Sequence, residues 1–203
     1  MIANAITISR IPLLALTAIL LYQEHALPRI VAAFLTILLI VLDSLDGYIA
    51  RIRGETSLLG SVLDIAADRT VEFVLWVVYA DLDLIPIAIP LIVLARGTFV
   101  DAVRAVAPAR GVTPFDLMRS KISRFMVKSP VFRTSFAIAK AAAFFLLALG
   151  YGLTASGHAW ADSVSFSAQI CAWLAFALCL ARGIPVLVEA PRILQEPSKP
   201  PSQ

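Results

Sequence analysis

The chain has 203 residues, of which 60% are hydrophobic and 15% are charged, with a formal net charge of +3. Soluble domains are about 45–50% apolar and about 25% charged, so this composition argues against a soluble globular protein and for an integral membrane protein. A membrane helix takes about 20 residues, so several spans leave little room for a separate soluble domain.

Six apolar segments follow one another, and each is long enough for a membrane helix. The sequence therefore predicts an all-α integral membrane protein with six transmembrane helices. The expected spans are Ala5–Tyr22, Ile30–Ile52, Leu58–Ala80, Leu84–Val106, Phe132–Thr154 and Val164–Val188. We place the membrane domain at residues 1–190 and expect the polar, proline-rich residues 191–203 to be a disordered tail.

The first apolar segment has one basic residue, Arg10, ahead of its longest apolar run, as a signal peptide does. The residues that follow the run, "QEHALPRI", offer no small-residue cleavage site. We therefore interpret the segment as a retained first span.

The connections between the expected helices, here called joints, alternate in charge along the chain. Basic residues gather in the joints after the second and fourth segments and in the tail, whereas the other joints hold Asp81, Asp83 and Asp162 with Arg29 as the single cation. By the positive-inside rule, both termini and the basic joints face the cytoplasm. The expected location is the cell membrane, in a multi-pass arrangement.

Four aspartates stand near the ends of the second and third expected helices, in stripes with small residues. The stripes are Asp43, Asp46, Gly47, Ala50 on one helix and Gly60, Asp64, Asp68 on the other. Spacings of three and four residues keep each stripe on one helix face, and the short joint makes the helices antiparallel neighbours. Gathered carboxylates repel one another, and hard divalent cations take oxygen ligands. The pattern predicts a site for divalent cations rather than solvated helix ends.

The small residues Gly47, Ala50 and Gly60 have two readings. They leave space beside the aspartates for a bulky group, and small residues also allow close packing between membrane helices. Taken alone, these residues leave both readings open.

The arrangement Asp43-x2-Asp46-Gly47-x2-Ala50-Arg51-x8-Gly60-x3-Asp64-x3-Asp68 resembles the signature of the class I CDP-alcohol phosphatidyltransferases. Every fixed position is present at the right spacing. The pattern is most similar to that of the phosphatidylglycerophosphate and phosphatidylinositol-phosphate synthases. The resemblance implies transfer of a phosphatidyl group from a CDP-linked lipid, such as CDP-diacylglycerol, to an alcohol, with release of CMP in phospholipid biosynthesis.

The resemblance also implies site residues and partners. Two divalent cations, Mg²⁺ or Mn²⁺, would be bound by Asp43, Asp46, Asp64 and Asp68, with Asp68 also the general base for the acceptor hydroxyl. The CDP-lipid would contact Asn4, Thr7, Gly47, Ala50, Arg51, Ser57 and Gly60. We expect an active site on the cytoplasmic side, a homodimer surrounded by membrane phospholipids, and no nucleic-acid partner.

Arg104 and Arg133 occupy places resembling those where family members with phosphorylated acceptors carry basic residues, and Lys140 is the third candidate for this site. This predicts glycerol 3-phosphate or inositol phosphate as acceptor, with serine, another alcohol or a second lipid left open. Cations near a membrane also snorkel to the interface, which is the alternative reading of these side chains.

The stretch "TPFDLMRSKISRFMVKSP" begins at Thr113, between the fourth and fifth expected spans. Its apolar and basic residues recur near helical spacing, which predicts a short amphipathic helix on the cytoplasmic surface. The helix would serve as an anchor to anionic lipid or as a lid for an anionic acceptor.

Two rival functions fit the aspartates less well. Membrane prenyl transfer also uses aspartate motifs, but it does not explain the spaced glycines and Arg51. A divalent-cation carrier would predict a repeat that relates the two halves of the chain, and the sequence shows none. Glu72 extends the aspartate stripe by one turn without an assigned role.

Overall fold

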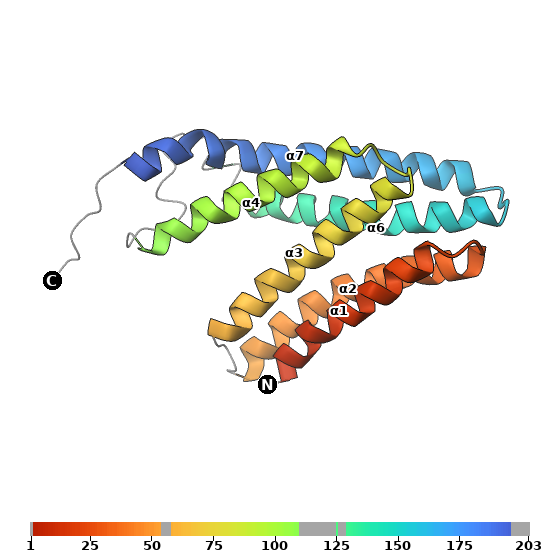
Figure 1. Cartoon of the computed structure of the whole chain (residues 1–203), viewed down its shortest axis with the longest axis horizontal. Helices are drawn as coiled ribbons and strands as arrows, with labels where there is room; N and C mark the ends of the chain where they lie inside the picture. The colour runs from red at the N-terminus through yellow and green to blue at the C-terminus, as the bar shows by residue number, and fades with distance from the viewer. Residues whose placement is uncertain (1, 54–57, 110–124, 126–128, 196–203) are drawn as a thin grey trace. The chain divides into compact units, whose positions relative to one another are not determined.

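The computed structural model describes residues 2–53, 58–109, 125 and 129–195 (Figure 1). Over these residues the chain forms six long α-helices and no β-strand, which confirms the expected all-α class. The helices are α1 (Ile2–Leu21), α2 (Ala26–Arg53), α3 (Leu58–Asp81), α4 (Ala88–Ala109), α6 (Pro130–Ala155) and α7 (Ala161–Gln195). Except for Phe125 and Ser129, the expected amphipathic segment at 113–129 lies outside the described residues.

Four of the described helices are long and apolar enough to cross a membrane. The expectation of a membrane protein is therefore supported, while a crossing by α3 and by α4 stays a prediction. Charged residues such as Asp64, Asp68 and Glu72 interrupt the apolar character of α3. The candidate spans are Asn4–Leu21, Ala26–Ile49, Pro130–Ala155 and Ala161–Glu189.

Prolines lie in the first turns of three helices. Pro28 and Pro90 lie near the starts of α2 and α4, and Pro130 is the first residue of α6. The first N–H groups of a helix have no partner within that helix, so a proline costs no hydrogen bond at the first turn. This explains how α2 starts at Ala26, before the apolar run that begins at Ile30.

The described chain divides into two compact units. The first comprises Met1–Pro90 and Lys140–Ala172, and the second comprises Leu91–Ala139 and Trp173–Gln203. In the first unit α1 packs along both α2 and α3, and it does so more extensively than α2 and α3 pack against each other (Figure 1). The helix ahead of the aspartates therefore joins the two helices that carry them.

A buried aromatic group joins α3 to α6 in the first unit. The rings of Trp76 and Phe144 meet edge to face with their centroids 4.8 Å apart. The phenol of Tyr79 donates a hydrogen bond of 2.7 Å to the carbonyl oxygen of Phe144. Edge-to-face geometry is favoured between aromatic rings, and a buried phenol hydroxyl usually needs a hydrogen-bond partner.

The second unit has its own small core. Val100 of α4 and Val186 of α7 are buried together, with Val103 and Leu187 packed against them. Nearby, the Arg96 side chain lies directly against Gly183, where a Cβ atom would collide with it. The absence of a side chain at Gly183 therefore lets Arg96 lie across α7.

A hydrogen bond links the end of α1 to the end of α3 outside the candidate spans. The Tyr22 phenol donates to the Asp81 carboxylate. This bond, with smaller contributions from burial and from the charge of Asp81, raises the pKa of Tyr22 to about 12.

We expect Tyr22 to titrate near pH 12. Because the pKa is raised in the folded state, the stabilising contribution is present below about pH 10, the ordinary tyrosine pKa, and is lost as the pH rises through about 12. Phenolate absorbance can be titrated in the unmodified chain, in Tyr22→Phe and in Asp81→Asn. The absorbance change that is lost in Tyr22→Phe belongs to Tyr22, and it should occur at lower pH in Asp81→Asn. If it occurs at the same pH in Asp81→Asn as in the unmodified chain, the assignment is contradicted.

Candidate metal centre

Three of the four predicted aspartates come together in the first unit. Asp43 and Asp46 of α2 and Asp64 of α3 each offer a carboxylate oxygen, and these oxygens all lie within 4.8 Å of one another. Asp68, one turn beyond Asp64 on α3, is partly buried. The two helical stripes therefore meet at Asp43, Asp46 and Asp64.

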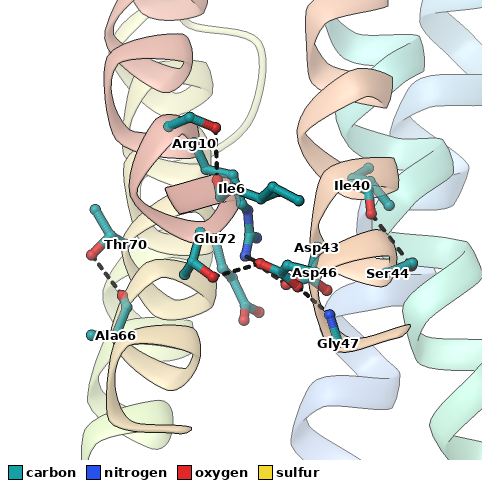
Figure 2. A network of polar contacts seen from close by, with 12 residues as sticks. Ile6, Arg10, Ile40, Asp43, Ser44, Asp46, Gly47, Ala66, Thr70 and Glu72 are labelled. Atoms are coloured by element: carbon teal, nitrogen blue, oxygen red, sulfur yellow. Dashed lines mark hydrogen bonds and ion pairs between the residues drawn. The ribbon is translucent and has the colours of Figure 1, made fainter. Parts of the chain in front are cut away.

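Asp46 is held firmly through both of its carboxylate oxygens. Thr7 Oγ1 of α1 donates a hydrogen bond of 2.8 Å to Asp46 Oδ2. The Gly47 amide donates one of 2.7 Å to Asp46 Oδ1 (Figure 2). The Asp46 side chain is 3% exposed. Thr7, predicted beside the nucleotide, thus contacts one of the clustered aspartates directly.

Arg10 is part of the site, although sequence reasoning considered it only as a possible flank of a signal peptide. Its side chain is 1% exposed, and Nη1 lies 2.7 Å from Asp43 Oδ1. The same nitrogen lies 4.0 Å from Asp46 Oδ2. Figure 2 shows the side chain reaching from α1 toward the two aspartates of α2. The available signal was an arginine within an apolar span, since an ionisable residue there is a functional hypothesis by default.

The cluster fits a hard divalent cation. Such cations bind carboxylate oxygens at about 2.0–2.6 Å, so oxygens on opposite sides of one ion are about 4–5 Å apart. The 4.8 Å limit on the three oxygens of Asp43, Asp46 and Asp64 falls within this range. Asp43 is partly exposed and Asp64 is exposed, so both carboxylates are accessible to a ligand.

The other residues predicted to bind the nucleotide of the CDP-lipid are described to different extents. Asn4 is partly buried, three residues before Thr7 on α1, and Gly47 and Gly60 are partly buried on α2 and α3. Ala50 and Arg51 belong to α2, but their side chains lie outside the described part of the chain, as does the whole of Ser57. Their contacts with a nucleotide stay predictions.

Glu72 is the centre of a second charged group in the first unit. Its Oε2 lies 3.2 Å from Arg69 Nη1, one turn earlier on α3, and 3.3 Å from Lys140 Nζ on α6. The Glu72 side chain is buried, and the two cations are more exposed. The structure thus gives the previously unassigned Glu72 two positively charged partners on two helices.

Of the three predicted acceptor residues, Lys140 lies against Glu72 in the first unit. Arg133 is exposed and belongs to the second unit. Arg104 lies in α4, and its side chain is outside the described residues. A shared acceptor site for these residues stays a prediction.

A comparison with protein families decides the identity of this group. The model of the CDP-alcohol phosphatidyltransferase family matches residues 1–181. The chain belongs to the CDP-alcohol phosphatidyltransferase family. The match includes all four aspartates, Thr7 and Arg10. A comparison with curated proteins finds no match.

The CDP-alcohol phosphatidyltransferases are phosphotransferases for substituted phosphate groups, so the chain is an enzyme of this class. The family depends on divalent cations, which supply positive charge to a diphosphate and its leaving group. The chain's own contribution is geometric and electrostatic. Thr7 and Gly47 fix Asp46, Arg10 offsets carboxylate charge, and Asp43 and Asp64 stay accessible.

Replacing Thr7 by valine removes the hydroxyl donor from Asp46 at nearly constant volume. Leaving a buried carboxylate oxygen with one donor fewer costs about 1–3 kcal/mol, so we expect about a tenfold loss of activity at limiting metal. The measurement is CMP release as a function of metal concentration. Thr17→Val is the matched control, because the buried Thr17 hydroxyl on α1 donates to the Leu13 carbonyl of its own helix. Equal effects of the two substitutions would contradict a specific role of Thr7.

Removing the Glu72 charge should destabilise the first unit. Because Arg69 and Lys140 are partly exposed, Glu72→Gln leaves no uncompensated buried charge. It should therefore lower the free energy of unfolding by about 1–3 kcal/mol, the contribution of a hydrogen bond to a charged group. The additional Lys140→Met substitution should then cost less than it does alone, because it removes a charge that no longer faces Glu72. Denaturant unfolding of the unmodified chain, the two single variants and the double variant in detergent measures this coupling. Additive effects would show that the two residues are independent.

Proposed function

We propose that the chain transfers a phosphatidyl group from a CDP-linked lipid, such as CDP-diacylglycerol, to a phosphorylated alcohol and releases CMP. The observation that carries this proposal is the cluster of Asp43, Asp46 and Asp64 in a chain of this family. Their oxygens provide the hard ligands that divalent cations prefer near a diphosphate.

Two divalent cations, Mg²⁺ or Mn²⁺, would be held by the four aspartates. The mutual proximity of three carboxylates supports one part of this site. The position of Asp68 one turn beyond Asp64 on the same helix supports its participation.

Asp68 is proposed as the general base. The acceptor oxygen would attack the phosphorus that carries the lipid, and the bond from that phosphorus to the CMP oxygen would break. CMP then leaves with the bonding electrons, and Asp68 takes the proton of the acceptor hydroxyl. The position of Asp68 one turn beyond Asp64 on α3 supports this role, and its side chain is partly accessible.

The CDP-lipid is proposed to lie beside the aspartates, against small and polar residues. The hydrogen bonds of Thr7 and Gly47 to Asp46 support this placement, because Asp46 is one of the clustered aspartates. The proposed set is Asn4, Thr7, Gly47, Ala50, Arg51, Ser57 and Gly60.

The proposed membrane layout has six spans, formed by the four apolar helices together with α3 and α4. Both termini and the aspartates would face the cytoplasm, and residues 113–129 would form a surface helix. The membrane domain would comprise residues 1–190, with a polar tail at 191–203 and a homodimer as the working assembly. The distribution of basic residues between alternate joints supports the orientation.

A phosphorylated acceptor, glycerol 3-phosphate or inositol phosphate, is proposed to bind Arg104, Arg133 and Lys140. Positive charge on these residues supports this class, because a phosphate pairs with lysine and arginine. The purified chain, supplied with CDP-diacylglycerol and Mg²⁺ or Mn²⁺, can be tested with glycerol 3-phosphate, inositol phosphate and serine. CMP release with a phosphorylated acceptor is expected, and release with serine alone would overturn the acceptor class.

Asp68→Asn should lower kcat about 100-fold or more, because general-base catalysis typically contributes about 10²–10⁴-fold. Asp81→Asn is the matched control: it removes the same charge from the far end of α3, where Asp81 accepts a bond from Tyr22. CMP release at saturating acceptor measures both variants. Near-normal turnover by Asp68→Asn would exclude Asp68 as the base.

A further inference from the structure

Arg10 is a buried cation that the proposed reaction does not use. It lies in α1 within the candidate span Asn4–Leu21, and its side chain is 1% exposed. A guanidinium in such a place is costly unless other charges offset it. The groups around Arg10 must therefore account for its presence.

Arg10 meets the aspartates as a charge rather than as a hydrogen-bonding fork. Its Nη1 is 2.7 Å from Asp43 Oδ1 and 4.0 Å from Asp46 Oδ2 (Figure 2). A strong arginine–carboxylate pair uses two parallel, well-directed bonds. Within the described part of the chain, however, the buried Arg10 Nε and Nη1 have no hydrogen bond of good geometry. Electrostatic attraction is therefore the main interaction between Arg10 and the two aspartates.

Asp46 does not need Arg10 to hold its position. Thr7 donates to one of its oxygens and the Gly47 amide donates to the other. Removing the Arg10 charge would thus leave this carboxylate oriented while it loses a neighbouring cation. The electrostatic effect of Arg10 can be separated from a positioning effect on Asp46.

We propose that Arg10 is a built-in counterion that competes with divalent cations for Asp43 and Asp46 and so weakens the metal affinity of the site. Without metal, Arg10 offsets the repulsion between the two carboxylates. With a cation bound, Arg10 and the ion are like charges a few ångströms apart and repel each other. The inference rests on the proposed function for the identity of the cation. It adds that the charge of Arg10 sets the affinity of the site for this cation.

The test measures binding of Mn²⁺ alone to the full chain in detergent, by titration calorimetry and by the shift of the thermal transition. Arg10→Gln, which removes the charge, is expected to bind Mn²⁺ about tenfold more tightly. Arg10→Lys retains the charge and should stay within about twofold of the unmodified chain. Arg29→Gln should do so as well, because it removes a cation that stacks on Tyr151 in the same unit.

Unchanged or weaker Mn²⁺ binding by Arg10→Gln would overturn the inference. If this variant unfolds without metal, Mn²⁺ is expected to restore its cooperative transition, and no recovery at saturating Mn²⁺ would also overturn it.

The double variant Asp43→Asn/Asp46→Asn separates this failure from failure of the proposed function. If the double variant no longer binds Mn²⁺ and Arg10→Gln binds it with unchanged affinity, only the counterion role is overturned. An unmodified chain that binds no Mn²⁺ would overturn both proposals.

Discussion

Repulsion among carboxylates near a membrane is the constraint on which the first unit depends. An aspartate at the centre of a membrane helix costs about 2.5–3.5 kcal/mol, and adjacent like charges add to that cost. Helix α1 reduces the cost by bringing Thr7 and Arg10 to the aspartates of α2. Because α1 packs along both α2 and α3, it joins the two helices that carry the clustered carboxylates.

Burial distinguishes two uses of acidic residues in this unit. Glu72 is buried and faces two cations of the protein itself, so its charge is offset within the fold. Asp43 and Asp64 remain accessible, although the charge of Asp43 is partly offset by Arg10. Asp46 is intermediate, since it is buried but fixed by hydrogen bonds and close to both of these carboxylates. The same side-chain charge is thus offset within the fold at one turn of α3 and left accessible at another.

The sequence was sufficient for features that depend on one helix at a time. Helical spacing placed Asp43 and Asp46 on one face, and the aspartate pattern identified the family before any geometry was known. The contact of α1 with the aspartates was not predictable in this way, because spacing defines a helix face but not the helix that packs on it. Arg10 was therefore considered only in relation to the apolar run that follows it.

The other features that the sequence did not predict depend on contacts between helices. Glu72 had no assigned role because one of its partners, Lys140, is on α6 and far away in sequence. The contact between Arg96 and Gly183 likewise joins two helices that no local pattern connects. The predicted roles of Ala50, Arg51, Ser57 and Arg104 rest on the family pattern alone, since the described structure does not include their side chains.

The charged group at Glu72 has a consequence for the order in which its ion pairs form as the chain is synthesised. Helix α3 is synthesised well before α6, so Glu72 must be accommodated before Lys140 exists. Arg69 precedes Glu72 by three residues on the same helix and is available as soon as that turn forms. Arg69 can therefore offset the charge of Glu72 during biosynthesis, before α6 has been made. Lys140 then adds a second cation to the group when α6 packs on α3.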